Sequence, residues 1–423
     1  MPHALAERAL AYFDDLFPEA APAIEVVAPS RDIIDQITAF DRFGANTLIE
    51  HVQGIPYFTN EYWTAGQRQA HAIHEVSYRA CFKPQLPEFF ISRLTSFGET
   101  VHDPFMGRGT TPVQAALMGR VPVANDINPL SKLLTRPRLN PPSIAQIDAF
   151  LAKVPWDREI EVREDLLAFY HPQTLAHLTV LKELLLAYAP LENDAPDPVA
   201  DWVRMVAINR LTGHSPGFFS VYTLPPNQAV SIAAQRKINE KRTQTPPVRD
   251  IRKIIVKKSR SLLKDGAPKF DGTALLLTGK ADSTAPIPDG SVSLVVTSPP
   301  FLDIVQYADD NWLRCWFAGI DASQIEIAMH KTEALWEEMV RNVLTEQARI
   351  LKPGGHVAFE VGEVRGGKVL LERLVWKAAE HLPFERLGVV VNQQEFTKTA
   401  NCWGVSNNRG GTNTNRIVLL RRE

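Results

Sequence analysis

Residues 100–118 read Thr-Val-His-Asp-Pro-Phe-Met-Gly-Arg-Gly-Thr-Thr-Pro-Val-Gln-Ala-Ala-Leu-Met. A short strand at 100–102 runs into a Gly-x-Gly loop and then into a helix at 111–118, and a second strand follows at 121–124. The glycines allow a tight turn and close approach of a ligand to the backbone. The helix start beyond them attracts a carboxylate or phosphate. This segment predicts an α/β fold with a ligand site at its loop.

The same alternation resumes late in the chain. Further strands are predicted at residues 274–277, 292–296, 356–361, 388–391 and 416–420, with helices at 332–351 and 369–380. We therefore expect a mostly parallel sheet covered on both faces. Between the second and third strands, leucines at helical spacing from Leu175 to Leu185 predict a largely helical insertion. The expected parts are an N-terminal extension (1–75), a first α/β part (76–130), the insertion (131–272) and a second α/β part (273–423).

Bulk composition narrows the class of protein. The chain has 423 residues, of which 45% are hydrophobic and 22% charged, as in ordinary soluble globular proteins. A net charge of −2 means that any contact with nucleic acid must come from a local patch. Cys81, Cys315 and Cys402 lie far apart, which argues against a disulfide framework or a cysteine zinc site. With no membrane-length apolar run and no signal-peptide pattern at the start, we expect a cytoplasmic protein without membrane contact.

Three carboxylates follow strands in the pattern of a nucleoside site. Asp103 ends the first strand, where it can accept a hydrogen bond from an ammonium group or water. Asp126 follows the second strand, where an acid can accept both hydroxyls of a ribose. Asp282 ends a third strand. Residue 112 is Pro, so the loop lacks the full G-x-G-x-x-G spacing, which weighs against NAD. The combination favours a nucleoside cofactor over a purely structural turn.

Residues 297–301 read Thr-Ser-Pro-Pro-Phe and directly follow the strand at 292–296. The two prolines fix their φ angles and remove two backbone donors, so the local carbonyls are stiff acceptors without competing N–H groups. A small hydroxyl and an aromatic face stand beside them. This arrangement suits a flat ring that carries an amine, whereas a Pro-Pro turn followed by a core Phe is the plain structural alternative.

These motifs resemble the S-adenosylmethionine-dependent amino-methyltransferases that act on DNA at cytosine N4 or adenine N6. Residues 103–111 match that family's D-P-F-x-G-x-G-T-T loop, and 82–88 resemble the Pro-bearing segment before it. Residues 125–129 resemble the ribose-binding turn, 280–283 the adenine-side acid, and 297–301 the catalytic S-P-P-Y/F. The motif order is unpermuted, and the place of the insertion matches none of the family's usual layouts cleanly.

The resemblance covers about residues 76–130 and 274–420, and it implies a Rossmann-like class I methyltransferase domain with S-adenosyl-L-methionine as cofactor. Asp126 would hold the ribose and Asp282 the adenine amine. The cofactor-binding residues that it implies are Lys83, Asp103, Phe105, Gly107, Gly109, Thr110, Thr111, Asp126, Asn128 and Asp282. The catalytic residues that it implies are Ser298, Pro299, Pro300 and Phe301. Residue 301 is Phe where many relatives have Tyr. Its ring could still stack on a target base, but any role of a tyrosine hydroxyl is lost.

The chemistry would be methyl transfer to the exocyclic amine of a base. Hydrogen bonds from the amine to Ser298 Oγ and the Pro299 carbonyl would localise the nitrogen lone pair, so catalysis is mostly positioning and electrostatics. Phe301 would stack on a base that is flipped out of the duplex. Ser at 298 favours cytosine N4 over adenine N6 in this resemblance. Methylation at cytosine C5 needs a thiolate nucleophile, and no cysteine lies in a Pro-Cys loop at the motif position.

Residues 231–264 hold eleven Lys and Arg against Glu240 and Asp250, a net charge of +9 that suits phosphate contacts. A solvated helix face is the alternative. The nucleic-acid-binding candidates are Arg236, Lys237, Lys241, Arg242, Arg252, Lys253, Lys257 and Lys258. Phosphate contacts do not set sequence choice, so base readers are sought in the loops at 213–220 and 222–228, with the loop around Arg409 as a second candidate.

The expected partner is double-stranded DNA, and a cognate restriction endonuclease of a restriction-modification pair is a candidate second partner. A methyltransferase acting on RNA or tRNA is the first rival, since relatives acting on guanine N2 share similar motifs. Those relatives usually carry Asn or Asp before Pro-Pro and an added RNA-binding domain. A non-catalytic nucleic-acid binder is the second rival, and intact Asp103, Gly107, Gly109 and Ser298 argue against it.

Overall fold

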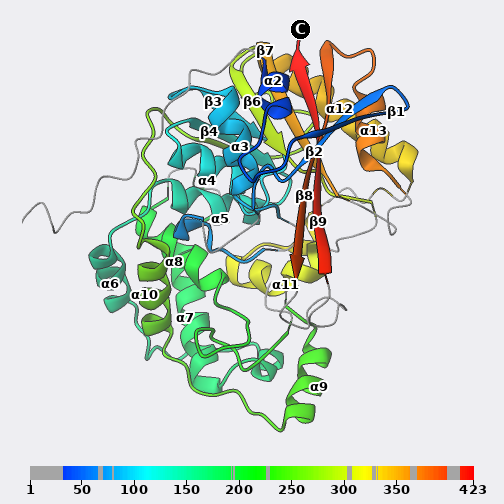
Figure 1. Cartoon of the computed structure of the whole chain (residues 1–423). Helices are drawn as coiled ribbons and strands as arrows, with labels where there is room; N and C mark the ends of the chain where they lie inside the picture. Colours follow the sequence, from blue (N-terminus) through cyan, green and yellow to red (C-terminus); the bar gives the residue numbers. More distant parts are fainter. Residues whose placement is uncertain are drawn as a thin grey trace, which may run out of the picture.

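The computed structural model describes residues 32–64, 70–78, 81–191, 193, 196–224, 229–302, 307–325, 330, 332–362, 369–397 and 410–423. One nine-stranded sheet runs through it in the order β1-β2-β8-β9-β7-β6-β3-β4-β5 (Figure 1). The strands are β1 (Leu48–Val52), β2 (Ile55–Asn60), β3 (Thr100–Asp103), β4 (Val121–Asp126), β5 (Leu275–Thr278), β6 (Val292–Thr297), β7 (Leu351–Val361), β8 (Phe384–Thr397) and β9 (Gly410–Arg422).

Strands β7, β6, β3, β4 and β5 run parallel, and β9 is antiparallel to both of its neighbours, β7 and β8. The order from β5 to β8, with one reversed strand next to the end, is that of a Rossmann-like class I methyltransferase domain. The predicted fold class is therefore confirmed. The carboxyl ends of β3, β4 and β6 meet at one edge of the sheet, which is where ligands bind in open α/β sheets.

Helices cover both faces of this sheet. One face packs against α12 (Glu333–Ile350) and α13 (Leu371–Ala378), and the other against α2 (Ile33–Thr38) and α3 (Gln85–Leu94). Alternation along the strands explains the two layers: Val295 of β6 faces the first and Val296 the second. Helix α4 (Thr110–Leu117) follows β3, and α5 (Pro129–Leu139) follows β4. No helix in the described ranges is long and apolar enough to cross a membrane.

The predicted helical insertion is present between β4 and β5, the second and third strands of the α/β part. After α5 it contains α6 (Ile144–Ala152), η3 (Glu164–Ala168), α7 (Pro172–Tyr188), α8 (Pro198–Ile208), α9 (Ile232–Arg242) and α10 (Ile251–Leu262). Its core, around the fully buried Trp202, is shared with α5 and with α11 (Tyr307–Ala318). In Figure 1 these helices form the lower part of the molecule, beyond the carboxyl ends of the parallel strands.

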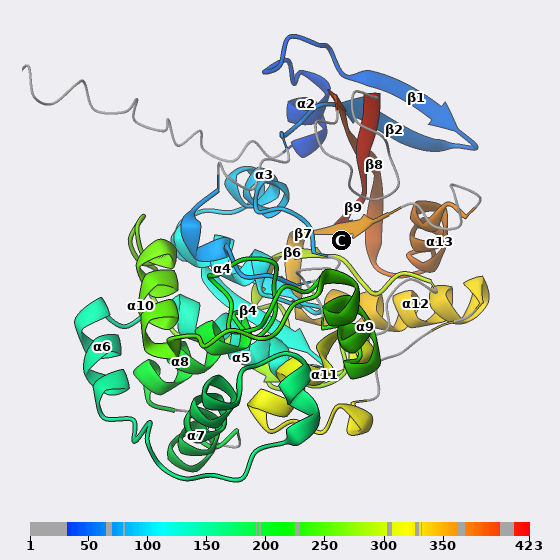
Figure 2. The same ribbon diagram turned by 90° about the horizontal axis from the view of Figure 1, so that it is seen from below.

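The N-terminal extension contributes two strands that the sequence did not predict. β1 and β2 form an antiparallel hairpin, and β2 pairs in parallel with β8, so the hairpin extends the sheet (Figures 1 and 2). All five residues of β1 are exposed, and its sequence, Leu-Ile-Glu-His-Val, does not alternate between apolar and polar residues. Asn392 of β8 ties this part down, because its Oδ1 accepts hydrogen bonds from the backbone N–H groups of Tyr62 (2.8 Å) and Trp63 (3.1 Å).

Candidate active site

The loop between β3 and α4 is held by hydrogen bonds to the Asp103 side chain. This side chain is 1% exposed, and its Oδ1 accepts from Thr297 Oγ1 (2.7 Å) and from the Phe105 backbone N–H (3.1 Å). Burial raises the pKa of Asp103 to about 7, with a smaller contribution from the charge of Asp126, while the hydrogen bonds act in the opposite direction. The bond to Thr297 connects the cofactor loop directly to the strand that carries Ser298.

Asp126 organises the neighbouring turn. Its Oδ2 accepts from the Gly107 N–H (2.8 Å) and its Oδ1 from the Asn128 N–H (2.9 Å), and Asn128 in turn caps α5 by accepting from the Leu130 N–H (3.0 Å). Burial raises the pKa of Asp126. A carboxylate offers about four acceptor positions, so each oxygen of Asp126 retains capacity for a hydroxyl of a bound ligand.

The two loop glycines meet different constraints. Gly107 has φ +50°, and a Cβ there would lie an ordinary 3.5 Å from Cys81 Sγ. Gly109 has φ +75°, and a Cβ there would lie 2.2 Å from Thr135 Oγ1 of α5. Gly109 is therefore required by packing against α5 as well as by its backbone conformation. This reason differs from the expected close approach to a ligand.

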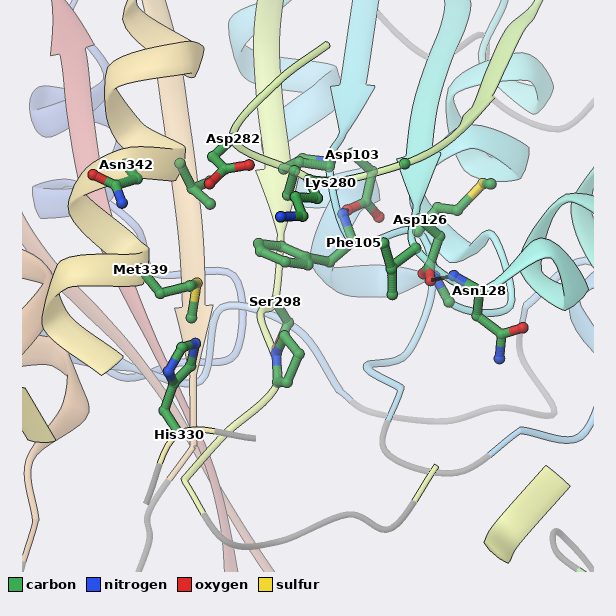
Figure 3. Close-up of a pocket in the computed structure, with 18 of the residues that line it drawn as sticks. Asp103, Phe105, Asp126, Asn128, Lys280, Asp282, Ser298, His330, Met339 and Asn342 are labelled. Atoms are coloured by element: carbon green, nitrogen blue, oxygen red, sulfur yellow. Dashed lines mark hydrogen bonds between the residues drawn. The ribbon is translucent and has the colours of Figure 1, made fainter. Parts of the chain in front are cut away.

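These loops line a cavity of about 320 Å³ at the carboxyl edge of the sheet (Figure 3). The predicted cofactor residues that line it are Asp103, Phe105, Gly107, Thr110, Asp126, Asn128 and Asp282, and the predicted catalytic residues that line it are Ser298 and Pro300. Phe105 projects into the middle, with Asp126 and Asn128 on one side and Met339 and Asn342 of α12 on the other (Figure 3). The structure thus brings both motif groups into one cavity.

Five predicted residues do not line this cavity: Lys83, Gly109, Thr111, Pro299 and Phe301, the last of which is described with its loop below. Gly109 packs against α5, and Thr111 donates from Oγ1 to the Val296 carbonyl of β6 at 3.0 Å, which fixes α4 on the sheet. Lys83 is half-buried, and burial lowers its pKa, followed by the charge of Arg108. Pro299 is buried in the loop between two lining residues.

The Ser-Pro-Pro-Phe loop is held by side chains from distant elements. Trp336 of α12 is 1% exposed and donates from Nε1 to the Pro300 carbonyl at 2.9 Å. Ser298 hydrogen-bonds to Glu360 of β7. Phe301 is half-buried and packs on Gly362, where a Cβ would lie 2.7 Å from its ring, and it does not line the cavity.

Sequence reasoning missed these supports and the buried arginines below the cofactor loop. Arg108 donates to the carbonyls of Val76 (3.0 Å) and Phe82 (3.2 Å), and Arg138 donates to the carbonyl of Arg108. Burial, then the charge of Arg108, lowers the pKa of Arg138 to about 9. The sequence feature that could have indicated these buried arginines is the arginine between the two glycines of the Gly-x-Gly motif, because this position faces the protein interior rather than solvent.

The basic segment is divided between two surfaces. Helix α9 contacts η3 and lies beyond the carboxyl edge, whereas α10 packs on α6 and α8 at the far side of the insertion (Figures 1 and 2). On α10, Arg252 pairs with Asp148 (2.9 Å) and Lys258 with Glu75 (3.2 Å), while Lys253 and Lys257 are exposed. The α9 residues Arg236, Lys237, Lys241 and Arg242 are all exposed. The eight predicted residues therefore do not form one patch.

The proposed base-reading loops are only partly accessible. Phe218 and Phe219 are buried, and Phe218 packs under the guanidinium of Arg210 at 4.1 Å. Tyr222 is half-buried and stacks against Arg242 of α9 at 3.8 Å. Residues 225–228 and the loop around Arg409 lie outside the described residues.

Comparison with known proteins gives a partial match. No family model matches the chain. The Type II methyltransferase M.MjaII from Methanocaldococcus jannaschii is 37% identical over 84 residues, which is 20% of this chain and 16% of that protein. The aligned part thus spans about one sixth of the curated relative.

Among solved structures, TrmN from Thermus thermophilus aligns with 84% of this chain and 53% of its own, at 12% identity and a TM-score of 0.33. A putative DNA modification methylase from the same organism, solved in complex with S-adenosyl-L-methionine, aligns with 33% of this chain and 50% of its own, at 23% identity and a TM-score of 0.18.

Proposed function

We propose that this protein is an S-adenosyl-L-methionine-dependent methyltransferase that modifies an exocyclic base amine in DNA, with cytosine N4 as the favoured target. The observation that carries the proposal is the shared cavity: a glycine loop with two strand-end carboxylates opens into the same space as Ser298 and Pro300. The sequence similarity to a Type II methyltransferase supports the same class. Adenine N6 is the alternative target.

The described residues fit this cofactor. The volume of about 320 Å³ lies within the range of small-molecule sites. Asp126 retains acceptor capacity for the ribose hydroxyls, Asp282 lines the cavity as an exposed acid for the adenine amine, and Asp103 provides negative charge near the methionine end. When bound, the cofactor supplies an electrophilic methyl group on a sulfonium. Its positive charge favours the ionised form of Asp103, whose pKa burial raises to about 7.

The chain's own contribution would be to hold the target amine. Ser298 Oγ and the Pro299 carbonyl are the acceptors, and the Trp336 hydrogen bond to the Pro300 carbonyl (2.9 Å) restrains the loop that presents them. Fixed acceptors that need no reorganisation are the source of electrostatic catalysis. Serine before Pro-Pro is the feature that favours cytosine N4, and Phe301, packed on Gly362, would meet a base only after repacking.

Nucleic-acid binding is assigned to α9. Its exposed Arg236, Lys237 and Lys241 form no ion pair with any other described residue. In Figure 1, α9 lies beyond the carboxyl ends of the parallel strands, and the cavity is lined by residues at that edge of the sheet. Replacing Arg236 and Lys237 by Glu should weaken DNA binding about tenfold or more and lower its salt dependence. The matched pair Arg252→Glu and Lys253→Glu on α10 should change binding less. Equal losses would assign the DNA surface to both helices.

The test of function is nucleoside analysis. The protein is expressed in cells that lack base methylation, and their DNA and RNA are digested separately and examined by mass spectrometry. We expect N4-methylcytosine in DNA. N6-methyladenine in DNA would instead identify adenine as the target base and would leave the proposed class of enzyme unchanged. Modification confined to RNA would overturn the DNA assignment, and it would bring forward the RNA or tRNA alternative. A Ser298→Ala variant serves as the inactive control.

A further inference from the structure

Helix α9 is attached to the insertion mainly by amide side chains. The only buried residue of this helix is Gln235, whose Nε2 donates to the Tyr222 carbonyl at 3.1 Å and to Asn239 Oδ1 at 2.8 Å. Asn239 donates from Nδ2 to the Ala168 carbonyl at 2.7 Å. Gln244, beyond the end of the helix, donates to the same Tyr222 carbonyl (3.0 Å) and the same Asn239 oxygen (2.8 Å). These three amides, the amide cluster, fix the end of α9 to Tyr222.

The backbone around Tyr222 is itself tied to the insertion on both sides. The N–H group of Val221 donates to the Phe169 carbonyl at 2.9 Å, and the N–H group of Thr223 donates to the Gly213 carbonyl at 3.1 Å. The Tyr222 ring is half-buried, so part of it remains open to a neighbouring side chain. Because the backbone is held at both neighbours and at its own carbonyl, the body of the insertion sets the position of this ring.

Arg242, in the last turn of α9, lies on the Tyr222 ring. The guanidinium carbon is 3.8 Å from the ring centroid, a separation at which the flat face of the guanidinium contacts the flat face of the ring. The N–H groups of Arg242 then point sideways from the stack. The side chain is exposed, and it forms no ion pair or hydrogen bond with any residue that the structure describes. The stack therefore orients a charged group whose donors are open to a ligand.

Stabilisation of the helix alone does not explain this arrangement. Basic side chains near the carboxyl end of a helix interact favourably with its dipole, and both Lys241 and Arg242 stand in the last turn of α9. The dipole requires the positive charge but not the stack on Tyr222. A planar guanidinium with open donors matches two oxygens of a phosphate through parallel hydrogen bonds, which an ammonium group cannot do.

We propose that Arg242, oriented by Tyr222 and the amide cluster, is a pre-oriented phosphate anchor of the DNA surface on α9. The proposal rests on the DNA methyltransferase function proposed above, and it ranks Arg242 above Lys241, its neighbour in the same turn. A side chain that is already held in place loses less conformational freedom when it binds. Tyr222 and Asn239 are positioning residues, which act through Arg242 without touching DNA.

The binding test uses a fluorescein-labelled DNA duplex of random sequence, because a phosphate contact acts on any sequence. The affinity of the full chain is measured by anisotropy over a range of salt concentrations. Arg242→Lys keeps the charge and its interaction with the helix dipole but loses the planar group, so it should weaken binding about fivefold or more. Lys241→Ala removes a charge from the same turn and should weaken binding by only about twofold.

The positioning role of Tyr222 has a separate readout. Tyr222→Leu removes the ring under Arg242 and should weaken binding about as much as Arg242→Lys, whereas Tyr222→Phe keeps the ring and should recover most of this loss. In the Arg242→Ala background, adding Tyr222→Leu should cause no further loss, because the two side chains act as one unit. Arg242→Ala should also lower the salt slope by about one, as expected for a lost phosphate contact.

Three outcomes overturn the proposal while leaving the function intact. They are an Arg242→Lys affinity within about twofold of wild type, an equal loss in Lys241→Ala, and additive losses in Tyr222→Leu and Arg242→Ala. If Tyr222→Leu does not fold, the comparison of Arg242→Lys with Lys241→Ala decides. A wild-type protein that binds no DNA duplex contradicts the proposed function itself, and binding only to an RNA duplex of the same sequence supports the RNA alternative.

Discussion

The two ends of the cavity are built in different ways. At the cofactor end, backbone N–H groups of two neighbouring loops (Phe105, Gly107 and Asn128) donate to Asp103 and Asp126, and Thr297 of β6 adds one side-chain bond to Asp103. At the target end, the Ser-Pro-Pro-Phe loop has two prolines without N–H groups and depends on Trp336 and Glu360 from other elements. A loop that supports itself can be recognised in a sequence, whereas a loop supported from outside depends on the whole fold.

The largest expected effect tests whether the target end of the cavity acts in methyl transfer without contributing to cofactor binding. Ser298→Ala should lower turnover at least about 100-fold, because it removes an acceptor that acts on the reacting amine. Cofactor affinity, measured by calorimetry, should be nearly unchanged, because the cofactor end supports itself. A large loss of cofactor affinity would show that the two ends are not independent.

The next effect tests whether Gly109 is a packing residue. Gly109→Ala should destabilise the fold by about 3 kcal/mol, because its Cβ would collide with Thr135 and the backbone has a positive φ. Gly107→Ala, with only ordinary contacts, should cost about 1 kcal/mol in denaturant unfolding. Adding Thr135→Ala to Gly109→Ala should restore part of the loss. Equal costs at both glycines would contradict the packing role.

A third effect concerns the charge of Asp103. Burial raises its folded-state pKa to about 7, above its usual value. The folded state therefore binds the proton more tightly, so the stability contributed below about pH 4 is lost as pH rises through about 7. The stability of Asp103→Asn relative to wild type should rise by about 4 kcal/mol between pH 4 and 8 in thermal unfolding. If the difference in stability between Asp103→Asn and wild type does not change with pH, the pKa of Asp103 is not raised by folding, and the prediction is wrong.

The smallest effect tests the external support of the target end. Trp336→Phe keeps most of the buried ring but removes the hydrogen bond to the Pro300 carbonyl. The transition state should lose about 1 kcal/mol of stabilisation, which lowers kcat several-fold, while KM for the cofactor should stay unchanged. Leu344→Met, also on α12 but outside the cavity lining, is a volume-matched control that should not alter the Pro300 carbonyl. A change in KM for the cofactor with kcat unchanged would instead show that Trp336 supports cofactor binding.

The sequence predicted what depends on local pattern. Strand–helix alternation was enough for the sheet and the insertion, and the loop at 103–111 with the acid after the second strand was enough to place Asp103 and Asp126 together. It did not predict Trp336 or Glu360, because their partners lie 36 and more residues away and their own neighbourhoods read as ordinary helix and strand. The basic segment was read as one surface, but Thr243 ends α9 with φ +48° and the chain then turns toward α10.

The hairpin at the N-terminal edge of the sheet affects how the chain must fold. β2 pairs with β8, and the Tyr62 backbone N–H bonds Asn392, 330 residues later. During synthesis β2 can pair with β1, but its other edge has no partner until β8 has been made. Contacts of such long range are slow to form, and exposed edges invite association. Completion of the sheet is therefore a late step, and the interval before it is when this chain depends most on protection from aggregation.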